Sequence, residues 1–159
     1  MREPIYEWNE DAGIAECAYV DNMNRTFSGV AMCHPEDKDI MSWRNGYSIA
    51  EYRARIAYAK TKRDDAKIAL DALNQLYYSV KHSSKYNEKD YMAKMLQRQI
   101  QLRKDEYDGL RGYLKQLKYD FKWYMNKMDE INAKYRKYRD NPEALAEIKE
   151  SELDKDKKF

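Results

Sequence analysis

The chain has little of what breaks a helix or cross-links a fold. Its 159 residues include five glycines, three prolines and two cysteines. This scarcity of glycine and proline favours long helices over a turn-rich sheet protein. Two cysteines, Cys17 and Cys33, are too few for a disulfide framework, and we expect both to be reduced thiols.

Long apolar runs are also missing. No stretch approaches the roughly 20 apolar residues that a membrane-spanning helix needs. Residues 1–8 lack the apolar core of a secretory signal peptide. These absences predict a cytoplasmic protein without a membrane partner.

What the chain does have is a regular apolar stripe along its last two thirds. Apolar and aromatic residues recur there in alternating steps of three and four, and Arg103 is the single polar exception. The stripe consists of Ala93, Leu96, Ile100, Arg103, Tyr107, Leu110, Leu114, Leu117, Phe121, Tyr124, Met128, Ile131, Tyr135 and Tyr138. This spacing predicts a long helix whose narrow seam packs against another helix.

A second stripe with the same spacing occupies residues 49–80 and is interrupted only by Arg63. Ser48 and Glu51 have the form of a capping box, so we expect a helix with Ser48 as its N-cap that ends near residue 81. The polar segment 82–87 would turn the chain, and the next helix would run from about residue 88 to the Asn141-Pro142 pair. The predicted fold class is mainly α, a long antiparallel two-helix coiled-coil hairpin.

The N-terminal region has a different pattern. Residues 14–20 and 26–33 alternate as two short strands would, around a turn at residues 21–25. If Val20 pairs with Thr26, Cys17 faces Gly29 and lies too far from Cys33 for a disulfide. An isolated hairpin is marginal in water, so we expect this small N-terminal β-hairpin to lie on a helix.

Charge is divided among three predicted regions. Residues 1–47, the β-hairpin and connector, carry four basic and nine acidic side chains, a net charge of −5. Residues 48–139, the helical hairpin, carry twenty-two basic and twelve acidic side chains, a net charge of +10. Residues 140–159, a predicted short helix and disordered tail, have a net charge of −3. A basic rod of this kind binds either an acidic partner or its own acidic segments.

The position of the predicted turn also determines which residues of the two helices lie side by side. Ser48 would lie beside Phe121, so the second helix would overhang the first, and its stripe at residues 124–138 would need a cover. We expect the β-hairpin to supply it, with a homodimer through residues 124–138 as the alternative. Arg63 and Arg103 would fall in one neighbourhood, which predicts a polar layer that sets the register of the two helices.

Catalytic signatures are weak. Residues 33–39 are rich in potential ligands, but Cys17 is the one further thiol, so we expect no metal site and no cofactor. Cys33 and His34 are adjacent and would point to opposite faces of a strand, which suits a nucleophile and its base poorly. The sequence has no glycine-rich phosphate loop, nucleophile elbow or HExxH motif. We therefore predict that the protein is not an enzyme.

The best candidate binding residues are aromatic. Tyr119 and Trp123 fall on the side of the second helix opposite its seam, and three lysines, Lys115, Lys118 and Lys122, surround them. An outward tryptophan ringed by lysines is typical of a protein-binding hot spot or a base-stacking platform. The alternative is that the β-hairpin or the C-terminal segment packs there.

Two stretches also carry a resemblance. They are Thr26-Phe27-Ser28-Gly29-Val30-Ala31-Met32-Cys33-His34-Pro35-Glu36-Asp37-Lys38-Asp39 and Gly46-Tyr47-Ser48-Ile49-Ala50-Glu51-Tyr52-Arg53-Ala54. Together with weaker likeness as far as about residue 130, this sequence resembles small proteins encoded by phages and prophages of Gram-positive bacteria. The resemblance assigns no functional residues.

The resemblance does imply a context. Small phage proteins without catalytic motifs often bind and block host machinery, including CRISPR and other defence systems, and others assist phage DNA replication or recombination. Our leading hypothesis is therefore a non-enzymatic protein that binds and inhibits a bacterial anti-phage defence complex, a protein or protein–nucleic-acid assembly, in an anti-CRISPR-like manner. The alternative is a nucleic-acid-binding accessory protein of phage replication or recombination.

Overall fold

Three strands, a short 3-10 helix and two long α-helices follow one another in the computed structural model, which describes residues 3–40, 42–82, 89–139 and 141. The elements are β1 (Ile5–Asn9), β2 (Ile14–Val20), β3 (Thr26–Met32), η1 (Pro35–Ile40), α1 (Trp43–Lys81) and α2 (Lys89–Tyr138). The predicted mainly helical chain with two long helices is confirmed. The helix and tail predicted for residues 142–159 lie outside the described residues.

The N-terminal sheet has one strand more than predicted. Its order is β1-β2-β3, and both neighbouring pairs are antiparallel. The predicted register of the β2–β3 hairpin is confirmed, because Val20 pairs with Thr26 and Cys17 with Gly29. The sequence does not predict strand β1, because the strand is short and four of its five residues are exposed, among them Ile5 and Glu7, which lies directly opposite Glu16.

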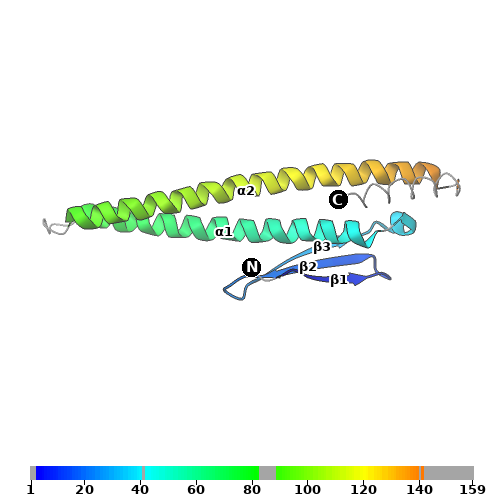
Figure 1. Cartoon of the computed structure of the whole chain (residues 1–159), viewed down its shortest axis with the longest axis horizontal. Coiled ribbons are helices and arrows are strands. Elements are labelled where there is room, and N and C mark those ends of the chain that lie inside the picture. The colour runs from blue at the N-terminus through cyan, green and yellow to red at the C-terminus, as the bar shows by residue number, and fades with distance from the viewer. Residues whose placement is uncertain (1–2, 41, 83–88, 140, 142–159) are drawn as a thin grey trace.

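Helix α1 lies between the sheet and α2, and the sheet covers only the first half of its length (Figure 1). Small side chains form the contact between sheet and helix. Ala15 and Ala31 from the strands pack with Ala50 and Ala54 of α1, and all four are buried. Gly29 lies over the same part of α1, so the two backbones approach closely.

The expected cover of the overhang by the β-hairpin is wrong. The sheet packs on α1, because its small buried residues match the alanines of that helix. The 3-10 helix and the first turn of α1 meet the distal part of α2 instead. Arg136 Nε donates to Asp37 Oδ1 at 2.7 Å, and the Tyr124 hydroxyl donates to Asn45 Oδ1 at 3.2 Å.

The start of α1 also differs from the prediction. The helix begins at Trp43 with Ser42 as its N-cap, so Ser48 lies inside the first turns and caps nothing. Glu51 does not complete a capping box, because its carboxylate accepts hydrogen bonds from the hydroxyls of Tyr6 and Tyr19 at 3.0 and 2.9 Å. Burial and the Glu51 carboxylate together raise the pKa of Tyr6 to about 12.

The apolar stripe of α2 is its buried side. From Ala93 to Tyr135 every stripe position except Arg103 is buried or partly buried. Leu114 and Leu117 pack with Ala59 of α1, and the ring of Tyr52 stacks on Phe121 with 5.6 Å between centroids. Because Phe121 meets Tyr52 rather than Ser48, the helices are aligned about one turn away from the predicted level.

An ion-pair network ties the β2–β3 turn to the middle of α1. Asp21 accepts two hydrogen bonds from the Arg25 guanidinium and lies 3.3 Å from Lys62 Nζ, while Arg25 also reaches Asp65 at 2.8 Å. Burial opposes the ionisation of Asp21, but hydrogen bonds from the backbone of Arg25 and Met23 and from the Arg25 side chain outweigh it and lower its pKa. The network fixes the sheet along the helix axis.

In the part of the chain that the structure describes, no helix is both long and apolar enough to cross a membrane.

Candidate interaction surface on helix α2

Five side chains on α2 form what we call the aromatic–lysine patch: Lys115, Lys118, Tyr119, Lys122 and Trp123. Tyr119 is 67% exposed and Trp123 is 57% exposed, and the three lysines are exposed as well. Residues 119 and 123 are one turn apart, so both rings lie on the same side of the helix. The structure brings all five predicted residues together, and their role in binding stays a prediction.

The orientation of the patch follows from the contacts on the other side of α2. Phe121 stacks on Tyr52, and Tyr124 reaches Asn45, so Lys122 and Trp123 between them are turned away from α1. A tryptophan with more than half of its surface exposed leaves apolar area in water that a partner could cover. The patch therefore lies on the exposed side of α2, while the opposite side of this helix packs against α1.

A shallow depression of about 480 Å³ borders the patch. Its lining residues come from both helices, and most of them are basic: Arg63, Asp108, Arg111, Gly112, Leu114, Lys115 and Lys118. Lys115 and Lys118 belong to both the patch and this basic depression. An acidic partner that covers the tryptophan would therefore meet positive charge on a surface wider than the patch.

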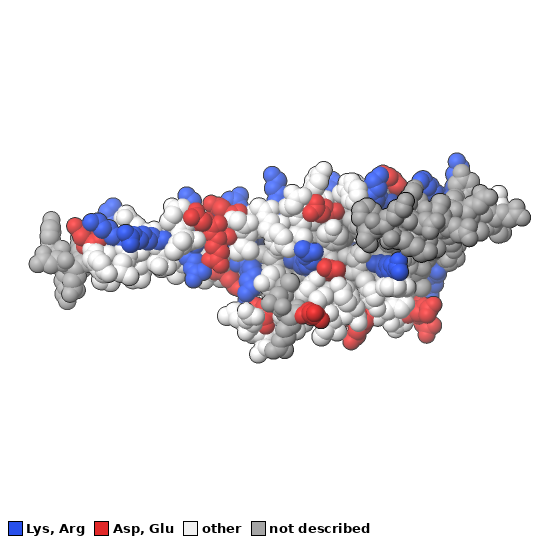
Figure 2. Space-filling view, in the orientation of Figure 1, with Lys and Arg blue, Asp and Glu red and all other residues white. Residues whose placement is uncertain are grey.

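Charge is distributed unevenly over the molecule. On the face in Figure 2, Lys and Arg side chains lie along much of the two long helices with acidic side chains among them, and further acidic side chains lie on the sheet below. Glu7, Glu10, Asp11 and Glu16 line a single depression at the β1–β2 end of the sheet. These four acidic residues belong to the sheet, which packs on α1, whereas the patch is on α2.

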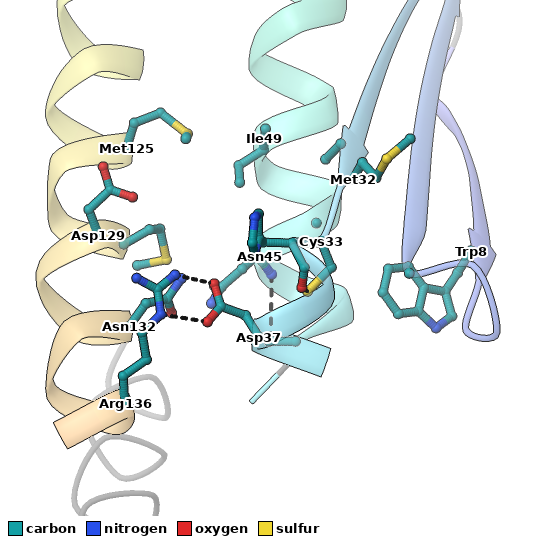
Figure 3. Close-up of a pocket in the computed structure, with 16 residues that line it drawn as sticks. Trp8, Met32, Cys33, Asp37, Asn45, Ile49, Met125, Asp129, Asn132 and Arg136 are labelled. Atoms are coloured by element: carbon teal, nitrogen blue, oxygen red, sulfur yellow. Dashed lines mark hydrogen bonds and ion pairs between the residues drawn. The ribbon is translucent and has the colours of Figure 1, made fainter. Parts of the chain in front are cut away.

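A second feature, which the sequence did not indicate, is a cavity of about 350 Å³ where all the main elements meet. The close-up in Figure 3 shows side chains from β1, β3, η1, α1 and α2 around it. Its apolar walls include Trp8, Met32, Ile49, Met125 and Met128. We call it the methionine-walled cavity.

The polar side of this cavity is anchored by an ion pair. The Arg136 guanidinium makes two hydrogen bonds to Asp37, which is 5% exposed, and these bonds lower the pKa of that carboxyl group despite its burial. The same contact raises the pKa of Arg136. Both groups therefore remain charged and hold η1 against α2.

Two other lining groups lack a close partner. Among the residues that the structure describes, neither the Asn132 carboxamide nor the Asp129 carboxylate makes a hydrogen bond or an ion pair within 4 Å, although the charge of Asp129 contributes to the raised pKa of Arg136. Residues 125, 129, 132 and 136 follow helical spacing beside the seam of α2, which is the one feature of the sequence that relates these lining residues to each other.

The structure does not bring the two seam arginines together. Arg63 bonds to its neighbour Asp64 on α1, and Arg103 bonds to Glu106 on α2 at 2.6 Å. Arg63 lies instead at the basic depression beside Arg111 and Gly112. Their role as a polar layer that sets the register stays a prediction.

The Cys17 thiol is not activated for chemistry. Cys17 is fully buried under α1, and burial together with the charge of Glu51 raises its pKa to about 11, so the unreactive protonated form dominates at neutral pH. The Cys33 thiol donates to the backbone oxygen of His34 at 3.4 Å. Within the described ranges there is no cluster of three or more His, Cys, Asp or Glu side chains that could hold a metal ion.

Comparison of the chain with protein-family models, with curated proteins and with solved structures finds no match.

Proposed function

We propose that this protein is a non-enzymatic, cytoplasmic phage or prophage protein that inhibits a bacterial anti-phage defence complex by binding it. The observation that carries the proposal is the exposure of Trp123 and Tyr119 among three lysines on one side of α2. Tryptophan and tyrosine are among the side chains that dominate binding energy at protein interfaces, and charged residues such as lysine belong to the polar rim around them. The phage context comes from the resemblance of residues 26–54.

The scaffold supports this proposal. We propose that α1 and α2 form an antiparallel coiled-coil hairpin, in which the seam contacts of Leu114, Leu117 and Phe121 fix the patch in advance. A rigid helix loses little conformational entropy when it binds, so most of the gain from burying Trp123 contributes to affinity. A homodimer through residues 124–138 stays a prediction, which light scattering of the purified protein tests.

The expected partner surface is acidic around an apolar groove. Lys115, Lys118 and Lys122 would meet the acidic groups at the rim, while Trp123 fills the groove. Such rim charges mainly accelerate association, so we expect the association rate to fall with added salt more than the dissociation rate rises. This behaviour separates the proposed protein partner from binding through phosphates alone.

The direct test is a plating assay. Gram-positive strains that each carry one defined defence system would express the wild-type protein or Trp123→Ala and be infected with a sensitive phage. We expect the wild type to restore plating on at least one strain, and Trp123→Ala to lose at least tenfold of that effect at equal protein level. Tyr91→Ala is the matched control, because Tyr91 is also on α2 and is 71% exposed.

The basic depression favours a second candidate, an accessory protein that binds nucleic acid. Arg63, Arg111, Lys115 and Lys118 could contact phosphates while Tyr119 and Trp123 stack on bases. Fluorescence anisotropy with labelled single-stranded DNA, duplex DNA and RNA tests it. Affinity that falls steeply with salt and is weakened in Trp123→Ala would support this function, and undetectable binding at low salt would reject it.

A further inference from the structure

We propose that the methionine-walled cavity is a socket for one apolar anchor side chain of the partner protein, and that asparagine side chains at its edge bind the peptide groups beside that anchor. This inference rests on the proposed protein partner. It adds a second contact site and states the chemistry of the segment that enters it: a large uncharged side chain, such as tryptophan, phenylalanine or leucine, within a peptide backbone.

The walls suit such an anchor. Met125 of α2 lies across from Ile49 of α1, and the sheet contributes Met32 and Trp8 (Figure 3). Met128 of α2 also lines the cavity. Methionine side chains are flexible and polarisable, and they make favourable contacts with aromatic rings. A volume of about 350 Å³ falls within the range of sites that enclose small ligands.

The edge suits a peptide group. Asn132 has no hydrogen-bond partner among the described residues, and Asn45 uses its oxygen for Tyr124, which leaves its NH₂ group as a donor. A carboxamide offers both donors and an acceptor, which is what the N–H and C=O groups of a peptide require. The two asparagines can therefore bind the backbone on either side of an anchor.

The charges favour an uncharged anchor over an anion. Arg136 is held by Asp37 in two hydrogen bonds, so its guanidinium is already engaged at the cavity. Asp129 adds a carboxylate to the lining. A phosphate or carboxylate would meet this negative charge, whereas an apolar side chain replaces water at the methionines without such a penalty.

The cavity is also continuous with the aromatic–lysine patch. Lys118, Lys122, Met125, Asp129 and Asn132 follow one another on α2 in steps of three and four, so they form one line along the helix. Met128 lies five positions after Trp123, an axial rise of roughly 7–8 Å, and about 140° around the helix from it. A partner segment that crosses Lys118 and Lys122 can therefore insert an anchor into the cavity while another part of the partner covers Trp123.

The test uses N-acetyl-L-tryptophanamide as a defined probe, an apolar side chain with a peptide group on each side. The purified full chain would carry ¹³C-methyl methionine and be titrated by NMR. We expect the methyl signals of Met125, Met128 and Met32 to shift in a saturable manner. The signals of Met23, Met92 and Met95, which lie elsewhere, serve as internal controls and should stay in place.

Asn132→Ala should lower the affinity for the probe roughly fivefold, which is the effect of losing one hydrogen bond. Asn126→Ala, a change of the same kind at an exposed position of α2 outside the lining, should leave the affinity unchanged. No saturable shift of Met125 and Met128, equal shifts of all methionines, or equal weakening in both variants would overturn the socket. Stronger binding of adenosine or N-acetyl-aspartate would also overturn it.

Trp123→Ala separates the two proposals. Trp123 does not line the cavity, so the probe should bind this variant with unchanged affinity. Probe binding together with no rescue of any defended strain would reject the proposed function and leave the socket chemistry standing. Rescue that depends on Trp123 without any probe binding would reject the socket alone.

Discussion

Gly29 of β3 lies against the backbone of α1 at Ala50. A methyl group on Gly29 would overlap the Ala50 carbonyl oxygen and lie 2.6 Å from the Ala54 backbone nitrogen. Neither of these backbone atoms can move without displacing the helix. The absence of a side chain at residue 29 therefore sets the distance between the sheet and α1, and with it the position of the Trp8 and Met32 walls of the cavity.

Gly29→Ala should destabilise the protein by about 3 kcal/mol or more, because the added methyl group meets backbone rather than a flexible side chain. Urea denaturation followed by circular dichroism measures this change. Gly109→Ala is the control: nothing lies within 4 Å of the added methyl group, and alanine in the helix should stabilise by about 0.5–1 kcal/mol. If both variants had the stability of the wild type, the close sheet–helix contact would be wrong.

Asp37→Asn should loosen η1 from α2. Loss of the charge-assisted hydrogen bonds to half-exposed Arg136 should cost about 1–2 kcal/mol at neutral pH. Because the pKa of Asp37 is lowered in the folded protein, its contribution is present above the unfolded pKa of about 4 and is lost as the pH falls through the folded value.

The variant should therefore lose less stability than the wild type on acidification, as measured by urea denaturation between about pH 7 and pH 3. Asp71→Asn, at an exposed position of α1, should follow the wild-type curve. Parallel curves for the wild type and Asp37→Asn would show that the ion pair does not stabilise the fold.

Tyr6 should make the protein sensitive to alkali. Its pKa is raised to about 12 by burial and by the hydrogen bond to Glu51, so the folded protein keeps the proton while the unfolded chain loses it. Stability from this group is complete below the unfolded pKa of about 10 and declines as the pH rises toward 12.

Glu51→Ala removes one of the two causes, so the pKa of Tyr6 should move down and the loss of stability above about pH 10 should become smaller than in the wild type. Urea denaturation at about pH 8 and about pH 11 provides the comparison. An unchanged alkaline loss in this variant would mean that Glu51 does not contribute to the shift.

Periodicity predicted the long helices well, because the seam positions determine which side of each helix is buried. The same periodicity predicted that Tyr119 and Trp123 face outward, since both lie opposite Leu117, Phe121 and Tyr124. These predictions depend on local spacing alone. The predicted alignment of the helices differs by about one turn, because the spacing within each helix does not determine how far one helix is shifted along the other.

Features that depend on tertiary contacts could not be predicted. Strand β1 spans only five residues, so the alternation of Tyr6 and Trp8 with polar residues is too short to identify a strand, and these two side chains contact α1 only when the sheet packs there. The sequence position of Glu51 predicts a capping residue, but in the folded protein its carboxylate accepts hydrogen bonds from Tyr6 and Tyr19 instead. The methionine-walled cavity combines residues from β1 to α2 that are up to 128 positions apart, from Trp8 to Arg136, so no sequence window contains it.

We propose Trp123 as the main contact with a host defence complex. The most direct measurement compares phage plating on defended strains that express the wild type, Trp123→Ala or Tyr91→Ala, with the thermal stability of each purified protein measured in parallel. We predict rescue by the wild type and Tyr91→Ala, at least tenfold less rescue by Trp123→Ala, and equal stability of all three. Rescue by Trp123→Ala at the wild-type level, or no rescue of any strain by the wild type, would contradict the account.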